Sequence, residues 1–202
     1  MRRPGAHIAG CRIVPLELSA LPQARTVLLL VDLINPMQFD GAEQLSAPAV
    51  KAAAAVAALK RDAAARGVPA VYVNDNFGHW RSDFHGLVAL CRRLRGTSGT
   101  LARMLAPHAR DFTVLKPRHS GFHATPLGFL LERMGTRHLV ITGLATDLCV
   151  QFTAMDAFLR GYSLWVPADC TAAESPARQQ AALKWMALAL KSHIRPSRSS
   201  GS

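Results

Sequence analysis

The chain has 202 residues, is 50% hydrophobic, and carries 24 Lys and Arg against 13 Asp and Glu, for a formal net charge of +11. This length and apolar content are enough for one substantial core, and the sequence shows no internal repeat or linker-like stretch. We therefore expect a single domain over 1–202 whose ends, about 1–20 and 195–202, are peripheral or disordered. Six of the positive charges lie near the two ends, and no basic motif with interleaved aromatic residues occurs, so we expect no nucleic-acid partner.

The apolar runs and the cysteines restrict the class of protein further. No apolar run approaches the ~20 residues of a membrane helix, since the best, at 27–31, is closed by Asp32. Only a few apolar residues precede Cys11, and Arg12 follows it, so we expect no signal sequence. The four cysteines are too few and too scattered for a disulfide framework or a zinc knuckle. A cytoplasmic protein without a membrane partner is the expectation.

Short apolar, β-branched runs alternate with helical patterns along the chain. Strands are predicted near 27–33, 69–75, 112–117, 138–144 and 162–168. Helices are predicted at 48–66, which opens with Pro48, at 83–95 before a break at 96–99, at 126–134, and at 175–191. This alternation predicts an α/β fold in which a parallel Rossmann-like sheet forms the middle of a three-layer α/β/α sandwich.

The helix at 175–191 is apolar nearly all round. Such a helix is usually buried, either in the core or against another subunit. We expect a homo-oligomer, although the sequence does not fix the oligomeric state.

The most informative stretch is 143–150, where a strand ends in Gly143 and Cys149 follows just inside a helix. Thr146 is a plausible N-cap, which would put Cys149 in the first turn. There the backbone amides and the helix dipole favour a thiolate and can hold an oxyanion, with Asp147 partly opposing the effect. Taken alone, Cys149 is better explained as an ordinary buried thiol, as most unpaired cysteines are.

Two further strands end in an ionisable group, Asp32 after 27–31 and Lys116 at the end of 112–115. Each alone has an ordinary explanation as a turn former or a solvated lysine. Together with Cys149 they place a base, a cation and a nucleophile at the carboxyl ends of strands, where open α/β sheets bind ligands. If all three converge, the first, third and fourth strands should be neighbours, which gives the strand order 2-1-3-4-5.

Three segments of the chain resemble the isochorismatase-like cysteine hydrolases, which include nicotinamidases and N-carbamoylsarcosine amidohydrolases. The segments that carry the resemblance are Leu29-Leu30-Val31-Asp32-Leu33-Ile34-Asn35, Val114-Leu115-Lys116-Pro117-Arg118-His119-Ser120-Gly121-Phe122, and Ile141-Thr142-Gly143-Leu144-Ala145-Thr146-Asp147-Leu148-Cys149-Val150. The resemblance covers nearly the whole chain and implies an Asp32, Lys116 and Cys149 triad. It also implies a cis peptide before Ala145, which turns that amide toward the substrate beside the amide of Cys149 as an oxyanion hole.

The chemistry implied is hydrolysis of a small amide or carbamoyl substrate through a thioester on Cys149, with no cofactor. Two alternatives stay open. One is the vinyl-ether hydrolysis that members of the same family catalyse without a cysteine nucleophile. The other is a redox-active or non-catalytic thiol protein on the same scaffold.

The chain departs from the metal-binding nicotinamidases after the second strand, where their Asp-x-His pair is broken at Phe77. We therefore expect no metal, although Asp75 with His79 and His85 could be imagined as ligands.

Several residues near the predicted site are candidates for substrate contact. Phe77 and Trp80 could form an aromatic wall over a planar substrate, with loop packing as the plain alternative. Arg118, His119, and more weakly Arg81, could recognise a substrate carboxylate. Phe122, in the same motif, completes this set.

Overall fold

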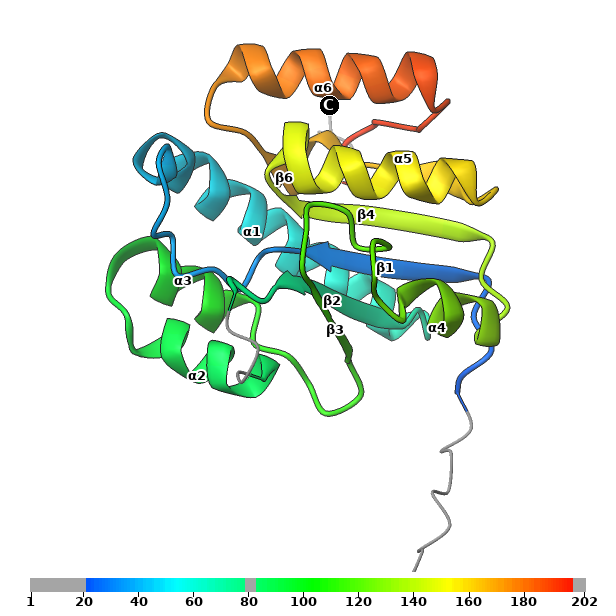
Figure 1. The fold of residues 1–202 in the computed structure, drawn as a ribbon, viewed down its shortest axis with the longest axis horizontal. Helices are drawn as coiled ribbons and strands as arrows, with labels where there is room; N and C mark the ends of the chain where they lie inside the picture. Colours follow the sequence, from blue (N-terminus) through cyan, green and yellow to red (C-terminus); the bar gives the residue numbers. More distant parts are fainter. Residues whose placement is uncertain (1–20, 79–82, 198–202) are drawn as a thin grey trace, which may run out of the picture.

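The computed structural model describes residues 21–78 and 83–197, which form a parallel sheet between two layers of helices (Figure 1). The strands are β1 (Thr26–Val31), β2 (Ala70–Asp75), β3 (Phe112–Lys116), β4 (His138–Leu144), β5 (Ser163–Trp165) and β6 (Thr171–Ala172). Every strand pairing is parallel. The predicted α/β class is confirmed.

The strand order is β3-β2-β1-β4-β5, with β6 paired to the end of β4, so the predicted order 2-1-3-4-5 needs correction. Strand β1 lies between β2 and β4, and β3 pairs with β2, where Asp75 is the register partner of Lys116. The prediction assumed that side chains which converge must come from adjacent strands. A lysine side chain is long enough to reach past one intervening strand, about 4.8 Å wide, so adjacency is not required.

Helices cover both faces of the sheet, as a three-layer sandwich requires. On one face, α1 (Ala42–Ala65), α2 (Phe84–Arg93) and α3 (Gly96–Met104) pack on Leu28 and Leu30. On the other, α4 (Leu127–Arg133), α5 (Gln151–Leu159) and α6 (Pro176–Ala189) pack on Val27, Leu29 and Val31. Alternate residues of one buried strand thus supply two separate hydrophobic cores.

Several predicted boundaries shift. Helix α1 begins at Ala42, six residues before Pro48, because buried Leu45 and Ala49 continue one apolar face through the proline. The predicted break at 96–99 is the first turn of α3. The predicted strand 162–168 is only β5, and the sheet edge is completed by β6 after a 3-10 turn at Ala168–Cys170.

Helix α6 is buried on one face only. Ser175 caps it by accepting a hydrogen bond from the Arg178 amide, and Leu183, Met186 and Leu190 enter the core. Trp185 and Leu188 stay exposed, so the nearly apolar helix is not buried all round within one chain. Among the described residues, no helix has the length and apolar content needed to cross a membrane.

Candidate active site

Asp32, Lys116 and Cys149 meet at the carboxyl edge of the sheet, as the sequence predicted. Lys116 Nζ lies 2.8 Å from Oδ2 of Asp32 and donates to Cys149 Sγ at 3.4 Å. The Asp32 charge acts on the Cys149 thiol in turn and raises its pKa. Lys116 is fully buried and Asp32 nearly so, while Cys149 is half-buried and open to a reactant. Lys116 therefore contacts both the carboxylate and the thiol.

The end of β4 shapes the turn that carries the thiol. Gly143 has φ +124°, and a Cβ there would lie 1.9 Å from the carbonyl oxygen of Val31 on the neighbouring strand. Only glycine satisfies both conditions. The next peptide bond, between Leu144 and Ala145, is cis, as the resemblance implied.

The helix beyond that peptide does not start as predicted. Thr146–Val150 is a single π-helical turn that continues into α5, and Ala145, not Thr146, is its N-cap residue. Ala145 has no side chain that could cap, and the Thr146 hydroxyl donates to Gln179 on α6 instead. Cys149 still lies in the opening turn, so the prediction of its position holds and that of its cap is wrong. The roles of the Ala145 and Cys149 amides stay a prediction.

Burial shifts the pKa of each ionisable group in the site. It raises the pKa of the Cys149 thiol, and the Asp32 carboxylate raises it further, against the opposing charge of Lys116. Burial likewise raises the pKa of Asp32, although Lys116 opposes the shift. Burial lowers the pKa of Lys116, but Asp32, Cys149 and Asp75 outweigh it, and the net shift is upward. Burial and the Asp32 charge thus oppose the predicted thiolate, while Lys116 favours it, and Asp32 is the carboxylate placed to accept the thiol proton.

His119 lies beside the thiol, with Nδ1 3.7 Å from Cys149 Sγ. The loop after β3 that carries His119 is hydrogen bonded to α5, because the Gly121 amide donates to the Thr153 hydroxyl at 2.9 Å. The His119 ring also lies 5.4 Å from the ring of Phe152, which is 41% exposed. Phe152 recurs at helical spacing with Leu148, Met155 and Leu159. Such spacing alone cannot distinguish a core position from one at the rim of a site.

The other predicted contact residues divide into three groups. Phe77 is exposed at the end of β2, and Arg118 is exposed in the loop after β3. Phe122 is only 5% exposed and stacks on Tyr162, which precedes β5 at the amino edge of the sheet. Its ring thus packs in the core, and its contact with substrate stays a prediction. Trp80, with His79 and Arg81, lies outside the described residues.

Asp75 joins the site in a role the sequence did not predict. Its Oδ2 lies 3.4 Å from Lys116 Nζ, and its backbone amide donates to Asp32. In the described ranges 21–78 and 83–197 no three His, Cys, Asp or Glu residues cluster as metal ligands. The signal in the sequence is the acidic residue that closes β2, although the nearby histidines suggest a metal ligand instead.

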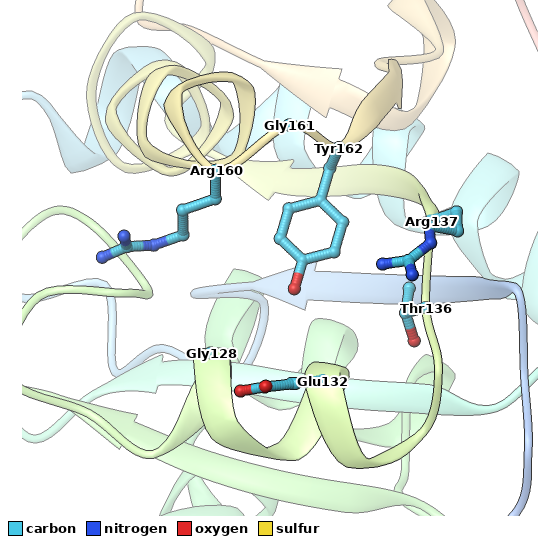
Figure 2. Close-up of a pocket in the computed structure, with 7 residues that line it drawn as sticks. All are labelled: Gly128, Glu132, Thr136, Arg137, Arg160, Gly161 and Tyr162. Atoms are coloured by element: carbon cyan, nitrogen blue, oxygen red, sulfur yellow. The ribbon is translucent and has the colours of Figure 1, made fainter.

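Two cavities lie at opposite edges of the sheet. One, of about 230 Å³, adjoins the site and is lined mainly by Phe77, Leu87, Leu90 and Leu115, with Asp75 at its edge. The other, of about 400 Å³, lies between α4 and the start of β5, where Figure 2 shows the Tyr162 phenol pointing toward α4. Since it lies at the amino edge of the sheet, it is separate from the three converging groups.

The chain thus combines a parallel α/β sandwich with an aspartate directly after β1, a lysine at the end of β3 and a cysteine in the turn after β4. The family model for the isochorismatase domain matches residues 26–194. The uncharacterized isochorismatase family protein YaaI of Bacillus subtilis (strain 168) is 37% identical over 166 residues, which are 82% of this chain and 91% of that protein. The chain therefore belongs to the isochorismatase family, as its motifs predicted.

Two further relatives have named activities. Ureidoacrylate amidohydrolase RutB of Klebsiella pneumoniae subsp. pneumoniae is 48% identical over 80 residues, which are 39% of this chain and 34% of that protein. The crystal structure of a pyrazinamidase/nicotinamidase from Streptococcus mutans UA159 superposes with a TM-score of 0.64 at 27% identity, covering 84% of this chain and 99% of that one.

Proposed function

We propose that this protein is a cysteine hydrolase that cleaves a small amide or carbamoyl compound through a thioester on Cys149. The observation that carries the proposal is that Lys116 Nζ contacts both Asp32 and Cys149 Sγ. Membership of the isochorismatase family supports it, and so do the amidohydrolase and nicotinamidase activities named for two relatives.

Acylation begins with the protonated thiol. Asp32 takes the Cys149 proton as the sulfur attacks the carbonyl carbon, so the C–S bond forms while negative charge develops on the carbonyl oxygen. The amides of Ala145 and Cys149 stabilise that oxygen. Asp32 then gives the proton to the nitrogen, the C–N bond breaks, and ammonia or an amine leaves.

Deacylation reverses the roles with water as the nucleophile. Asp32 takes a proton from the water that attacks the thioester, the C–S bond breaks, and the proton returns to the sulfur. The products are a carboxylic or carbamic acid and the free thiol. Lys116 keeps Asp32 oriented and counters the negative charge that arises on sulfur.

The test measures ammonia release from ureidoacrylate, nicotinamide and N-carbamoylsarcosine by the wild type and by Cys149→Ala. We expect turnover of at least one compound by the wild type, none by the variant, and an acyl adduct on Cys149 by mass spectrometry after acid quenching. Cys170→Ala, which removes a buried thiol, is the matched control and should keep activity. Undiminished ammonia release by Cys149→Ala would refute the thioester route and leave direct attack of water on the carbonyl carbon.

A further inference from the structure

Gln179, near the start of α6, connects three separate segments around the thiol. Its Oε1 accepts the Thr146 hydroxyl at 2.5 Å. Its Nε2 donates to the Ala168 carbonyl oxygen at 3.2 Å, and to the carbonyl oxygen and hydroxyl of Thr171 at 3.2 and 3.1 Å. The π-helical turn, the 3-10 turn and β6 are thus held by one side chain, and both atoms of its amide group are used.

The turn that carries Cys149 depends on this external support. Its N-cap residue, Ala145, offers no capping side chain, and the fully buried Thr146 directs its hydroxyl to Gln179 rather than to a nearby backbone amide. Thr146 directly follows Ala145 and begins the turn that contains Cys149. Its position therefore affects the orientation of the Ala145 and Cys149 amides.

Arg178, the residue before Gln179 on α6, forms an ion pair with Asp147, the residue after Thr146 in the turn. Arg178 Nε lies 2.5 Å from Oδ2 of Asp147, and the same guanidinium pairs with Glu174. Two consecutive residues of α6 therefore hold two consecutive residues of the turn. Figure 1 shows how this is possible, because the chain passes from β6 into α6, which lies alongside α5.

We propose that Gln179 is a positioning residue that, through Thr146, fixes the turn presenting the Ala145 and Cys149 amides to the substrate. This inference rests on the proposed function. Donors that stabilise an oxyanion must be placed before the charge develops, and a displacement of about 1 Å can cost roughly 100-fold in rate. The isolated turn has no side-chain cap with which to hold that geometry, and α6 supplies it.

The test compares Gln179→Met with Gln180→Met, which removes the same amide one residue later from an exposed position. In Gln179→Met we expect kcat to fall roughly 10- to 100-fold with KM changed less than about 3-fold. The rate of Cys149 alkylation by iodoacetamide should stay within about 3-fold of wild type, because that reaction forms no oxyanion. Gln180→Met should match the wild type in all three measurements.

Thr146→Val isolates the connection without disturbing the other three hydrogen bonds of Gln179, and so serves if Gln179→Met does not fold. It should show the same fall in kcat, and the double variant should be no more than about 2-fold slower than either single one. Independent, multiplicative losses would overturn the route through Thr146.

If Gln179→Met keeps the wild-type kcat and has only a lower thermal midpoint, Gln179 stabilises the fold without positioning the turn for catalysis. That result would overturn this inference and leave the proposed function standing. Absence of wild-type turnover on every compound would instead overturn the proposed function, and this inference with it. The wild-type assay therefore separates the two failures.

Discussion

The backbone amide of Asp75 donates to Oδ1 of Asp32 at 2.7 Å, while the other oxygen of Asp32 contacts Lys116. The end of β2 therefore orients the carboxylate that ends β1, and each oxygen has a fixed partner. These two contacts hold the buried carboxylate in one orientation. They also oppose the effect of burial, which raises its pKa. It also separates two roles of Asp75, since its amide holds Asp32 and its side chain pairs with Lys116.

The first prediction concerns the proton on Cys149. Because burial and the Asp32 charge both raise the pKa of the thiol, its alkylation by iodoacetamide should titrate above the free-thiol value of about 8.5. Asp32→Asn removes the negative charge and should lower that midpoint, although the same change should lower turnover by about 100-fold or more by removing the proton acceptor. Labelling of Cys149 against pH, read by mass spectrometry, measures the midpoint.

Asp75→Asn is the matched control for that experiment. It removes a carboxylate that contacts Lys116 and keeps the backbone donor to Asp32. We expect a smaller shift of the midpoint and a much smaller loss of turnover than in Asp32→Asn. A wild-type midpoint below about 8.5 would contradict the raised pKa of the thiol.

The second prediction concerns Lys116, the buried cation. Lys116→Met leaves Asp32 buried without its partner and should lower the free energy of unfolding by about 3 kcal/mol near neutral pH. Without Lys116, burial holds the folded pKa of Asp32 above its unfolded value, so the penalty grows as the pH rises through that range and fades as the carboxyl is protonated. Urea unfolding at about pH 5 and about pH 8 measures the difference.

Lys51→Met on the exposed side of α1 is the comparison, and should change stability by less than about 0.5 kcal/mol at either pH. A Lys116→Met penalty that is equal at the two pH values would argue against an ionised Asp32 as its origin.

The third prediction concerns the glycine at the end of β4. Gly143→Ala places a methyl group 1.9 Å from a backbone oxygen at φ +124° and should cost roughly 4 kcal/mol or prevent folding. Gly161→Ala shares a positive φ but has open space around the added carbon, so about 1 kcal/mol is expected. Thermal and urea unfolding of both variants give the comparison, and equal losses would show that contact with Val31 is not the cause.

The fourth prediction concerns Phe152, whose ring lies 5.4 Å from that of His119. If the pair flanks a bound planar substrate, Phe152→Ala should raise KM by roughly 3- to 10-fold with little change in kcat. Phe158→Ala removes a similarly exposed ring further along α5 and should leave KM unchanged. An unchanged KM in Phe152→Ala would show that the ring packs against the His119 loop without contacting substrate.

The sequence by itself determined the layers of the fold and the three ionisable groups at the strand ends. Buried parallel strands read as continuous apolar runs, so β1 and β4 could be recognised from composition, and the polar residue closing each run marked the edge of the sheet. The cis peptide before Ala145 followed from the resemblance, because no local property of Leu144 or Ala145 predicts it.

Only the tertiary structure decided which strands are neighbours, what charge the site carries, and how the turn is held. Strand order depends on how the crossover helices pack. Because a long side chain such as Lys116 can reach the site across another strand, converging side chains do not show that their strands are neighbours. The raised pKa of Cys149 comes from burial and from Asp32, more than a hundred residues away in sequence. The support of the turn by Gln179 is likewise a contact between distant segments, and local patterns carry no information about such contacts.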